Sequence, residues 1–135
     1  MVALPKNSLY FRTLQGSLLV GAAYDALLGL AMLFTPQLLT GILGVPRPGE
    51  DFYLWLLGWL LLMLAGFYTL GAYDPMAYRG NIGVAIVGRA VAAAILAYAA
   101  WRHGFPGLYL PAVVDLLFAI VHTVAWRGMR RLPGS

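Results

Sequence analysis

Long apolar runs alternate with short polar connections along the chain. Four runs of about 20 residues occupy positions 14–34, 52–72, 81–101 and 108–126, and few charged residues interrupt them. An α-helix rises about 1.5 Å per residue, so about 20 apolar residues cross the hydrocarbon core of a bilayer. The pattern therefore predicts four transmembrane helices in a single domain that covers residues 1–135.

The connections between the runs carry signals for turns and for one extra helix. Thr35 and Pro36 form a cap-then-proline signal that begins a short apolar helix, PQLLTGIL, expected to lie along the membrane surface. Asp74 and Pro75 repeat this signal before the third run, and glycine with proline marks the other loops. Short connections favour antiparallel neighbours. The expected fold is therefore all-α, an integral membrane four-helix bundle, up-down-up-down, with a short interfacial helix after the first span.

Composition places most of the molecular surface in lipid. Hydrophobic residues make up 61% of the chain and charged residues 10%, compared with about 25% charged in soluble domains. The sequence has no cysteine, which excludes disulfides, thiol redox chemistry and thiolate metal sites. The net charge of +4 comes mostly from residues near the ends of the runs, which is typical of membrane topology and not of nucleic-acid binding. The predicted partner is a lipid bilayer.

The lysines and arginines outside the runs predict the orientation of the chain. Cytoplasmic loops of membrane proteins carry an excess of these residues. If both termini are cytoplasmic, six of them lie inside and two outside. The inner set is Lys6, Arg12, Arg79, Arg127, Arg130 and Arg131, and the outer set is Arg47 and Arg102. We therefore expect a multi-pass protein with both termini in the cytoplasm.

Charged residues lie near the middle of three of the predicted spans. Asp25, Arg89 and Asp115 fall within roughly 6 Å of one another in depth when residues are counted along each helix. Left unpaired in a bilayer, these charges would cost on the order of 8–10 kcal/mol. We predict that Arg89 pairs with Asp115, Asp25 or both inside the bundle. A structural clasp between helices and a functional site both account for such a cluster.

One arginine does not neutralise two aspartates, so the surplus carboxylate should be protonated or bind a proton or cation. His122 lies seven residues after Asp115 on the same helical face, with Ala119 between them. Asp115, His122 and Tyr68 are therefore candidates for one polar track. Packing in the bundle or a place at the interface is the more common role of a single histidine such as His122 and of a tyrosine such as Tyr68. Two aspartates and one histidine are a poor set of transition-metal ligands, so no metal site is predicted, and no catalytic residue is identified.

Five segments of the chain form a pattern that is shared with a known group of proteins. They are LLGLAMLFTPQLL, LLGWLLLMLAGFY, the Tyr73-Asp74-Pro75 junction, GRAVAAAIL and DLLFAI. Together they resemble the DoxX-like group of small four-helix bacterial membrane proteins. The likeness is one of layout and hydropathy over most of the chain, without a diagnostic catalytic motif. The resemblance implies the bacterial inner membrane and either quinone-coupled oxidation or an accessory role in a membrane redox complex. It implies quinone as the candidate cofactor, and it carries over no site residue.

The leading hypothesis is a small membrane protein that binds a hydrophobic or quinone-like ligand, or that serves as the accessory subunit of a redox complex. Arg89 would organise the site, Asp25 and Asp115 would balance its charge, and His122 would exchange protons. One alternative is a proton- or ion-coupled transporter acting as a homo-oligomer, because four spans enclose little lumen. Another is a lipid or sterol isomerase in which a buried carboxylate stabilises a cationic intermediate. Whether the chain catalyses a reaction stays open.

Overall fold

The protein is an all-α, four-helix membrane bundle, as the pattern of apolar runs predicts. A computed structural model describes residues 8–131, so Lys6, expected on the cytoplasmic side, lies outside the described residues. Four of the helices are long and apolar enough to cross a membrane. The elements are α1 (Leu9–Phe34), α2 (Pro36–Leu43), α3 (Phe52–Tyr73), α4 (Arg79–His103), the 3₁₀ helix η1 (Pro106–Leu108) and α5 (Tyr109–Arg130).

The helices contain the predicted spans and extend beyond some of them. Helix α1 begins at Leu9 rather than at residue 14, because Ser8 caps it by accepting a hydrogen bond from the N–H of Phe11 at 3.2 Å. Helix α5 continues to Arg130 rather than ending at residue 126. Hydropathy marks the part of a helix that lies in hydrocarbon, and the polar turns that continue it into the interface escape that signal.

The two cap-then-proline signals act differently in the structure. Pro36 occupies the first turn of α2, as expected, but Thr35 does not cap this helix with its side chain. The Thr35 hydroxyl instead donates to the carbonyl of Ala31 at 3.3 Å, because it is still within reach of the last turn of α1. Asp74 closes the turn that precedes α4 and does not cap the helix itself, since its carboxylate accepts from the N–H groups of Met76 and Ala77 at 3.1 and 3.0 Å and α4 begins only at Arg79.

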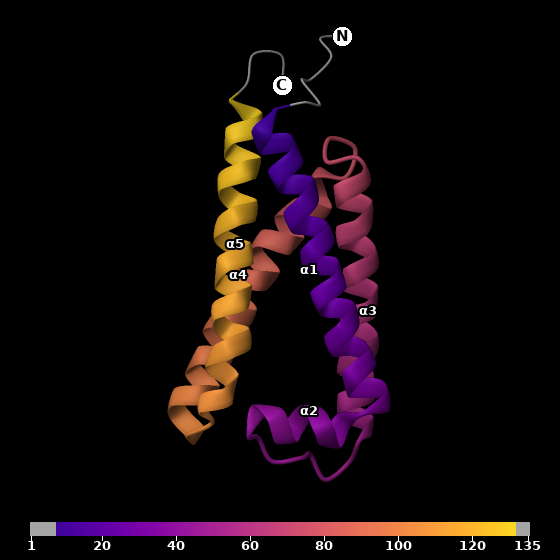
Figure 1. Ribbon diagram of the computed structural model, residues 1–135, viewed down its shortest axis with the longest axis vertical. Helices are drawn as coiled ribbons and strands as arrows, with labels where there is room; N and C mark the ends of the chain where they lie inside the picture. The colour runs from indigo at the N-terminus through magenta and orange to yellow at the C-terminus, as the bar shows by residue number, and fades with distance from the viewer. Residues whose placement is uncertain (1–7, 132–135) are drawn as a thin grey trace.

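The long helices are arranged as two antiparallel pairs (Figure 1). Helix α1 packs along α3, α4 packs along α5, and the pairs meet mainly through α1 and α5. The pairs are close at the end that carries both termini and spread towards the other end, where α2 lies across the bundle. Gly107 of η1 sits directly against the carbonyl of Leu43 at the end of α2, with no room for a side chain. Helix α2 therefore bridges the two pairs where they are furthest apart.

Tight packing is concentrated in the half of the bundle near the termini. The large side chains that are almost fully buried lie at the depth of Asp25 or on its terminal side; among the apolar ones are Leu14, Leu18, Ile82 and Met129. Many large apolar side chains on the outer faces of the helices are exposed, as expected where lipid covers them. The charged cluster predicted from the sequence therefore lies where the packed half gives way to the spread half.

Candidate functional site

Arg89 lies at the centre of the bundle and joins three helices. Its side chain is 4% exposed, and its Nη1 donates to Asp115 Oδ1 of α5 at 2.5 Å. Its Nη2 pairs with Asp25 Oδ2 of α1 at 2.9 Å and donates to the carbonyl oxygen of Gly21 at 3.0 Å. The predicted pairing of Arg89 is thus present with both aspartates. Counting residues along the separate helices predicted that the three charged groups lie at similar depths. They lie close enough for one guanidinium to reach both carboxylates.

A glycine makes this contact between α1 and α4 possible. A methyl carbon placed on Gly21 would lie 3.3 Å from Arg89 Nη2 and 3.7 Å from the ring of Phe118. The absence of a side chain therefore leaves room for the guanidinium beside the helix backbone. Gly21 lies one helical turn before Asp25, so backbone carbonyl and carboxylate face Arg89 from the same side of α1.

Three aromatic rings surround the Arg89 guanidinium. Its Cζ lies 5.4, 5.2 and 5.0 Å from the ring centroids of Tyr24, Tyr68 and Phe118. These distances are those of cation–π contacts, which strengthen when the cation is removed from water. Tyr68, a predicted member of the polar cluster, therefore belongs to the surroundings of Arg89 through the face of its ring and through its hydroxyl, which interacts with the guanidinium.

Sequence reasoning missed two of these rings. Phe118 follows Asp115 by three residues and so was within reach of the cluster by helical spacing, whereas Tyr24 directly precedes Asp25 and adjacent residues of a helix do not share a face. Aromatic residues are common throughout apolar spans, which hides such a signal. What could have revealed Phe118 is that it also precedes His122 by four residues, and so shares a face with both polar groups.

Among the residues that the structure describes, the cluster has a charge that is not neutralised and a hydrogen-bond donor that has no acceptor. It contains two carboxylates for one guanidinium, which gives a formal charge of −1 if both acids are ionised. Arg89 Nε is buried and has no hydrogen-bond acceptor among residues 8–131. A buried donor without an acceptor costs about 1–3 kcal/mol. A site that binds another polar group would show both features.

His122 is completely buried beside the cluster, but it is not hydrogen-bonded to it. Its ring stacks on Phe118 with centroids 5.8 Å apart. The ring interacts with the backbone of Ser17 on α1, yet neither nitrogen reaches hydrogen-bond geometry with any group in the described part of the chain. The expected polar track from Asp115 to His122 is therefore interrupted, because the aromatic ring of Phe118, and not a polar group, connects His122 with Arg89.

A second ion pair lies on the surface, at the end of the bundle that carries α2, and its role is structural. In the loop before α3, Arg47 Nε donates to Asp51 Oδ1 at 2.7 Å, and Arg47 Nη2 pairs with Asp51 Oδ2. The hydrogen bond from Arg47 lowers the pKa of the Asp51 carboxyl below its usual value. Exposed pairs of this kind contribute little to stability, so we assign this one to the shape of the loop.

Comparison of the chain with protein-family models, curated proteins and solved structures gives no match. The resemblance to the DoxX-like group therefore stays a prediction, and the site must be interpreted from its own geometry.

Proposed function

We propose that the protein binds a lipid-soluble, quinone-like molecule whose polar head is held at the Arg89 cluster. The observation that carries this proposal is the buried Nε–H of Arg89, which has no acceptor among residues 8–131. A ligand carbonyl oxygen is an acceptor that would satisfy this donor, and a charged donor makes a strong hydrogen bond. The ligand would reach the site from the bilayer, because the helices present apolar side chains on their outer faces.

Two further properties of the cluster support a flat, oxygen-bearing head group. The rings of Tyr24, Tyr68 and Phe118 offer aromatic faces against which a conjugated ring can stack. The surplus carboxylate can hold a proton, and a protonated carboxyl is a hydrogen-bond donor to a second ligand oxygen. In this role the chain supplies the binding site, and a partner protein carries out the electron transfer. That division is the accessory function that the resemblance implies.

The surplus carboxylate also favours the alternative of proton-coupled transport. Transport, however, needs a polar path from the cluster to both membrane faces. On the terminal side, Leu14, Leu18 and Ile82 are fully buried around the bundle axis, and they form a dry barrier within one chain. Ligand binding from the lipid side has no such requirement, so it is the better supported of the two functions. No observation in the described structure favours the isomerase.

The proposal is tested by measuring quinone binding to the protein in nanodiscs. The probes are a decyl-substituted benzoquinone and its tailless parent, titrated by isothermal calorimetry. Arg89→Lys keeps a positive charge between the two aspartates but removes the Nε–H donor. A hydrogen bond to a charged group is worth about 1.5–3 kcal/mol, so we expect the affinity for both quinones to fall by roughly 10–100-fold.

Arg102→Lys is the matched control, because Arg102 is exposed at the end of α4. It should bind both quinones as the wild type does. Circular dichroism and gel filtration would establish that Arg89→Lys is folded. The proposal is wrong if the wild type binds neither quinone, or if folded Arg89→Lys binds them with unchanged affinity.

A further inference from the structure

An apolar groove runs along the outer side of the contact between α1 and α5. Its volume is about 340 Å³, within the range of small-ligand pockets. The one hydroxyl in its wall belongs to Ser17 and is occupied, since it donates to the carbonyl of Leu14 at 3.1 Å. The walls are formed mainly by Gly16, Ser17 and Val20 of α1 and by Leu117, Phe118 and Val121 of α5.

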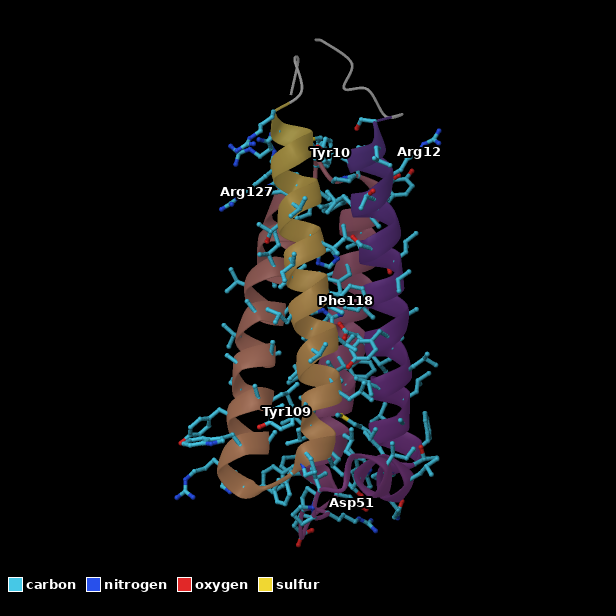
Figure 2. All side chains as sticks on the ribbon, turned by 60° about the vertical axis from the view of Figure 1, so that its left-hand side comes forward. Tyr10, Arg12, Asp51, Tyr109, Phe118 and Arg127 are labelled. Carbon is cyan, nitrogen blue, oxygen red and sulfur yellow. The ribbon has the colours of Figure 1, made fainter. Side chains whose placement is uncertain are left out.

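Phe118 separates this groove from the buried polar groups. One part of the side chain lines the groove, while its ring lies 5.0 Å from the Arg89 guanidinium and 5.8 Å from the His122 ring. Figure 2 shows Phe118 at mid-height, between the ribbons of α5 and α1. The wall between groove and cluster is therefore one aromatic side chain thick. Gly21 faces this ring with no side chain of its own, and a methyl carbon placed there would lie 3.7 Å from the ring.

We propose that the groove holds the hydrocarbon chain of the ligand, and that Phe118 turns aside to let the head group reach Arg89 and His122. This inference rests on the proposed function and adds the route and the tail site. The unsatisfied nitrogens of Arg89 and His122 lie directly behind Phe118, and each side chain is more than nine-tenths buried. A polar head that passes Phe118 would meet them, while its tail would remain in the apolar groove.

A hydrocarbon tail suits this groove better than a polar group would. The lining offers no free hydrogen-bonding side chain, because the Ser17 hydroxyl is already bonded within α1. A tail in a bilayer is already in apolar surroundings, so the groove gains affinity by close packing and not by the hydrophobic effect. The resulting preference for a tailed ligand should therefore be moderate.

Filling the groove with protein tests the tail site. No atom outside its own helix backbone lies within 4 Å of a methyl carbon placed on Gly16, so Gly16→Leu can place a side chain in the groove from a position where its Cβ meets no neighbour. Gly66 of α3 is equally open and lies away from the groove, which makes Gly66→Leu the matched control. We expect the wild type and Gly66→Leu to prefer the decyl quinone over its tailless parent by about tenfold, and Gly16→Leu to lose that preference.

Chemical modification of histidine tests the movement of Phe118. The chain contains two histidines, and His103 is exposed at the end of α4, so it serves as an internal reference. With diethyl pyrocarbonate, we expect Phe118→Ala to raise labelling of His122 relative to His103 by about tenfold. Phe118→Trp should slow the labelling of His122 below the wild-type rate. Loss of the fold would not produce this decrease. The control variant Phe67→Ala removes an exposed ring of α3 and should leave the labelling of His122 unchanged.

The outcomes separate the two proposals. If both quinones bind the wild type but Gly16→Leu keeps the preference for the tailed one, the groove holds bulk lipid only and the inference is overturned, while the proposed function stands. If His122 labelling is the same in Phe118→Ala, Phe118→Trp and the wild type, Phe118 does not control access and the inference is also overturned. If neither quinone binds the wild type, both proposals are wrong.

Discussion

At the scale of single residues, the stability of the cluster depends on charge balance more than on the number of contacts. Arg89 is the only counter-charge that Asp25 and Asp115 have within the described cluster. Loss of Arg89 leaves two carboxylates in a low dielectric, whereas loss of one carboxylate leaves a neutral pair. Removing one partner of a buried pair is costly because an uncompensated charge remains. The three residues are therefore not equivalent.

We predict an asymmetry among variants of the cluster. Asp25→Asn and Asp115→Asn should each change the free energy of unfolding by about 1 kcal/mol or less, because a one-to-one pair with Arg89 survives. Arg89→Met and the double variant Asp25→Asn/Asp115→Asn should each lower it by about 3–5 kcal/mol. Unfolding in mixed micelles of dodecylmaltoside and increasing dodecylsulfate, followed by circular dichroism, measures these differences.

The exposed Glu50 provides the control, since Glu50→Gln changes a carboxylate in the loop before α3 and should be neutral. If either single asparagine variant is as unstable as Arg89→Met, the two aspartates act as one unit. The charge-balance argument is then wrong.

At the scale of elements, α1 is the helix that packs against both its own partner helix and the other pair of helices. It packs against α3 and α5, and two of its glycines allow close approach, one to α3 and one to Arg89 of α4. Gly21 admits Arg89 near α5, while Gly29 meets Gly58 of α3 so closely that a methyl carbon on either would lie 2.7 Å from the carbonyl oxygen of the other. Ser17, Gly21, Asp25 and Gly29 recur every four residues, so a single stripe of small and polar residues serves both neighbours.

Closing the space at Gly29 should push α1 and α3 apart. Gly29→Ala is expected to lower the free energy of unfolding by about 1–3 kcal/mol, because the new methyl group meets backbone that cannot move aside. Gly66→Ala, at an open lipid-facing position of α3, should be neutral or stabilising by up to about 1 kcal/mol, since alanine favours a helix. The same detergent unfolding assay compares them, and equal stability of the two variants would contradict the close approach.

At the scale of the whole molecule, the bundle has two unlike ends. Both termini lie at one end, where Arg12 and Arg127 point outward from α1 and α5 (Figures 1 and 2). The loop with Arg47 and Asp51 lies at the other end, beside α2. The even number of long helices places both basic termini on one face of the membrane. The excess of arginine at that face is why we predict that it is cytoplasmic.

Single cysteines test this orientation, because the chain contains none of its own. In spheroplasts, a membrane-impermeant maleimide should label Glu50→Cys, in the loop before α3, and Arg102→Cys, in the last turn of α4, both on the predicted outer face. It should label Ala77→Cys, in the connection between α3 and α4, only after lysis. The wild type controls for background labelling. The opposite pattern would place both termini outside.

Residue pattern alone determined the helices, their order and the pairing of Arg89 with at least one of two aspartates; the structure showed that it pairs with both. Apolar length marks a span, prolines and glycines mark its ends, and the cost of an unpaired charge in lipid makes pairing at equal depth almost obligatory. The start of α1, the end of α5 and the cap at Thr35 differ from those expectations, and all three lie where polar interface replaces hydrocarbon.

The tertiary structure alone decided which helices are neighbours, that the two pairs spread towards α2, and that Phe118 lies between Arg89 and His122. The physical reason is the solvent. In water, polar residues mark the outer face of a helix, and the apolar stripe shows which way it packs. In lipid, both faces are apolar, so the sequence reveals how deep a residue lies but not which way most side chains point.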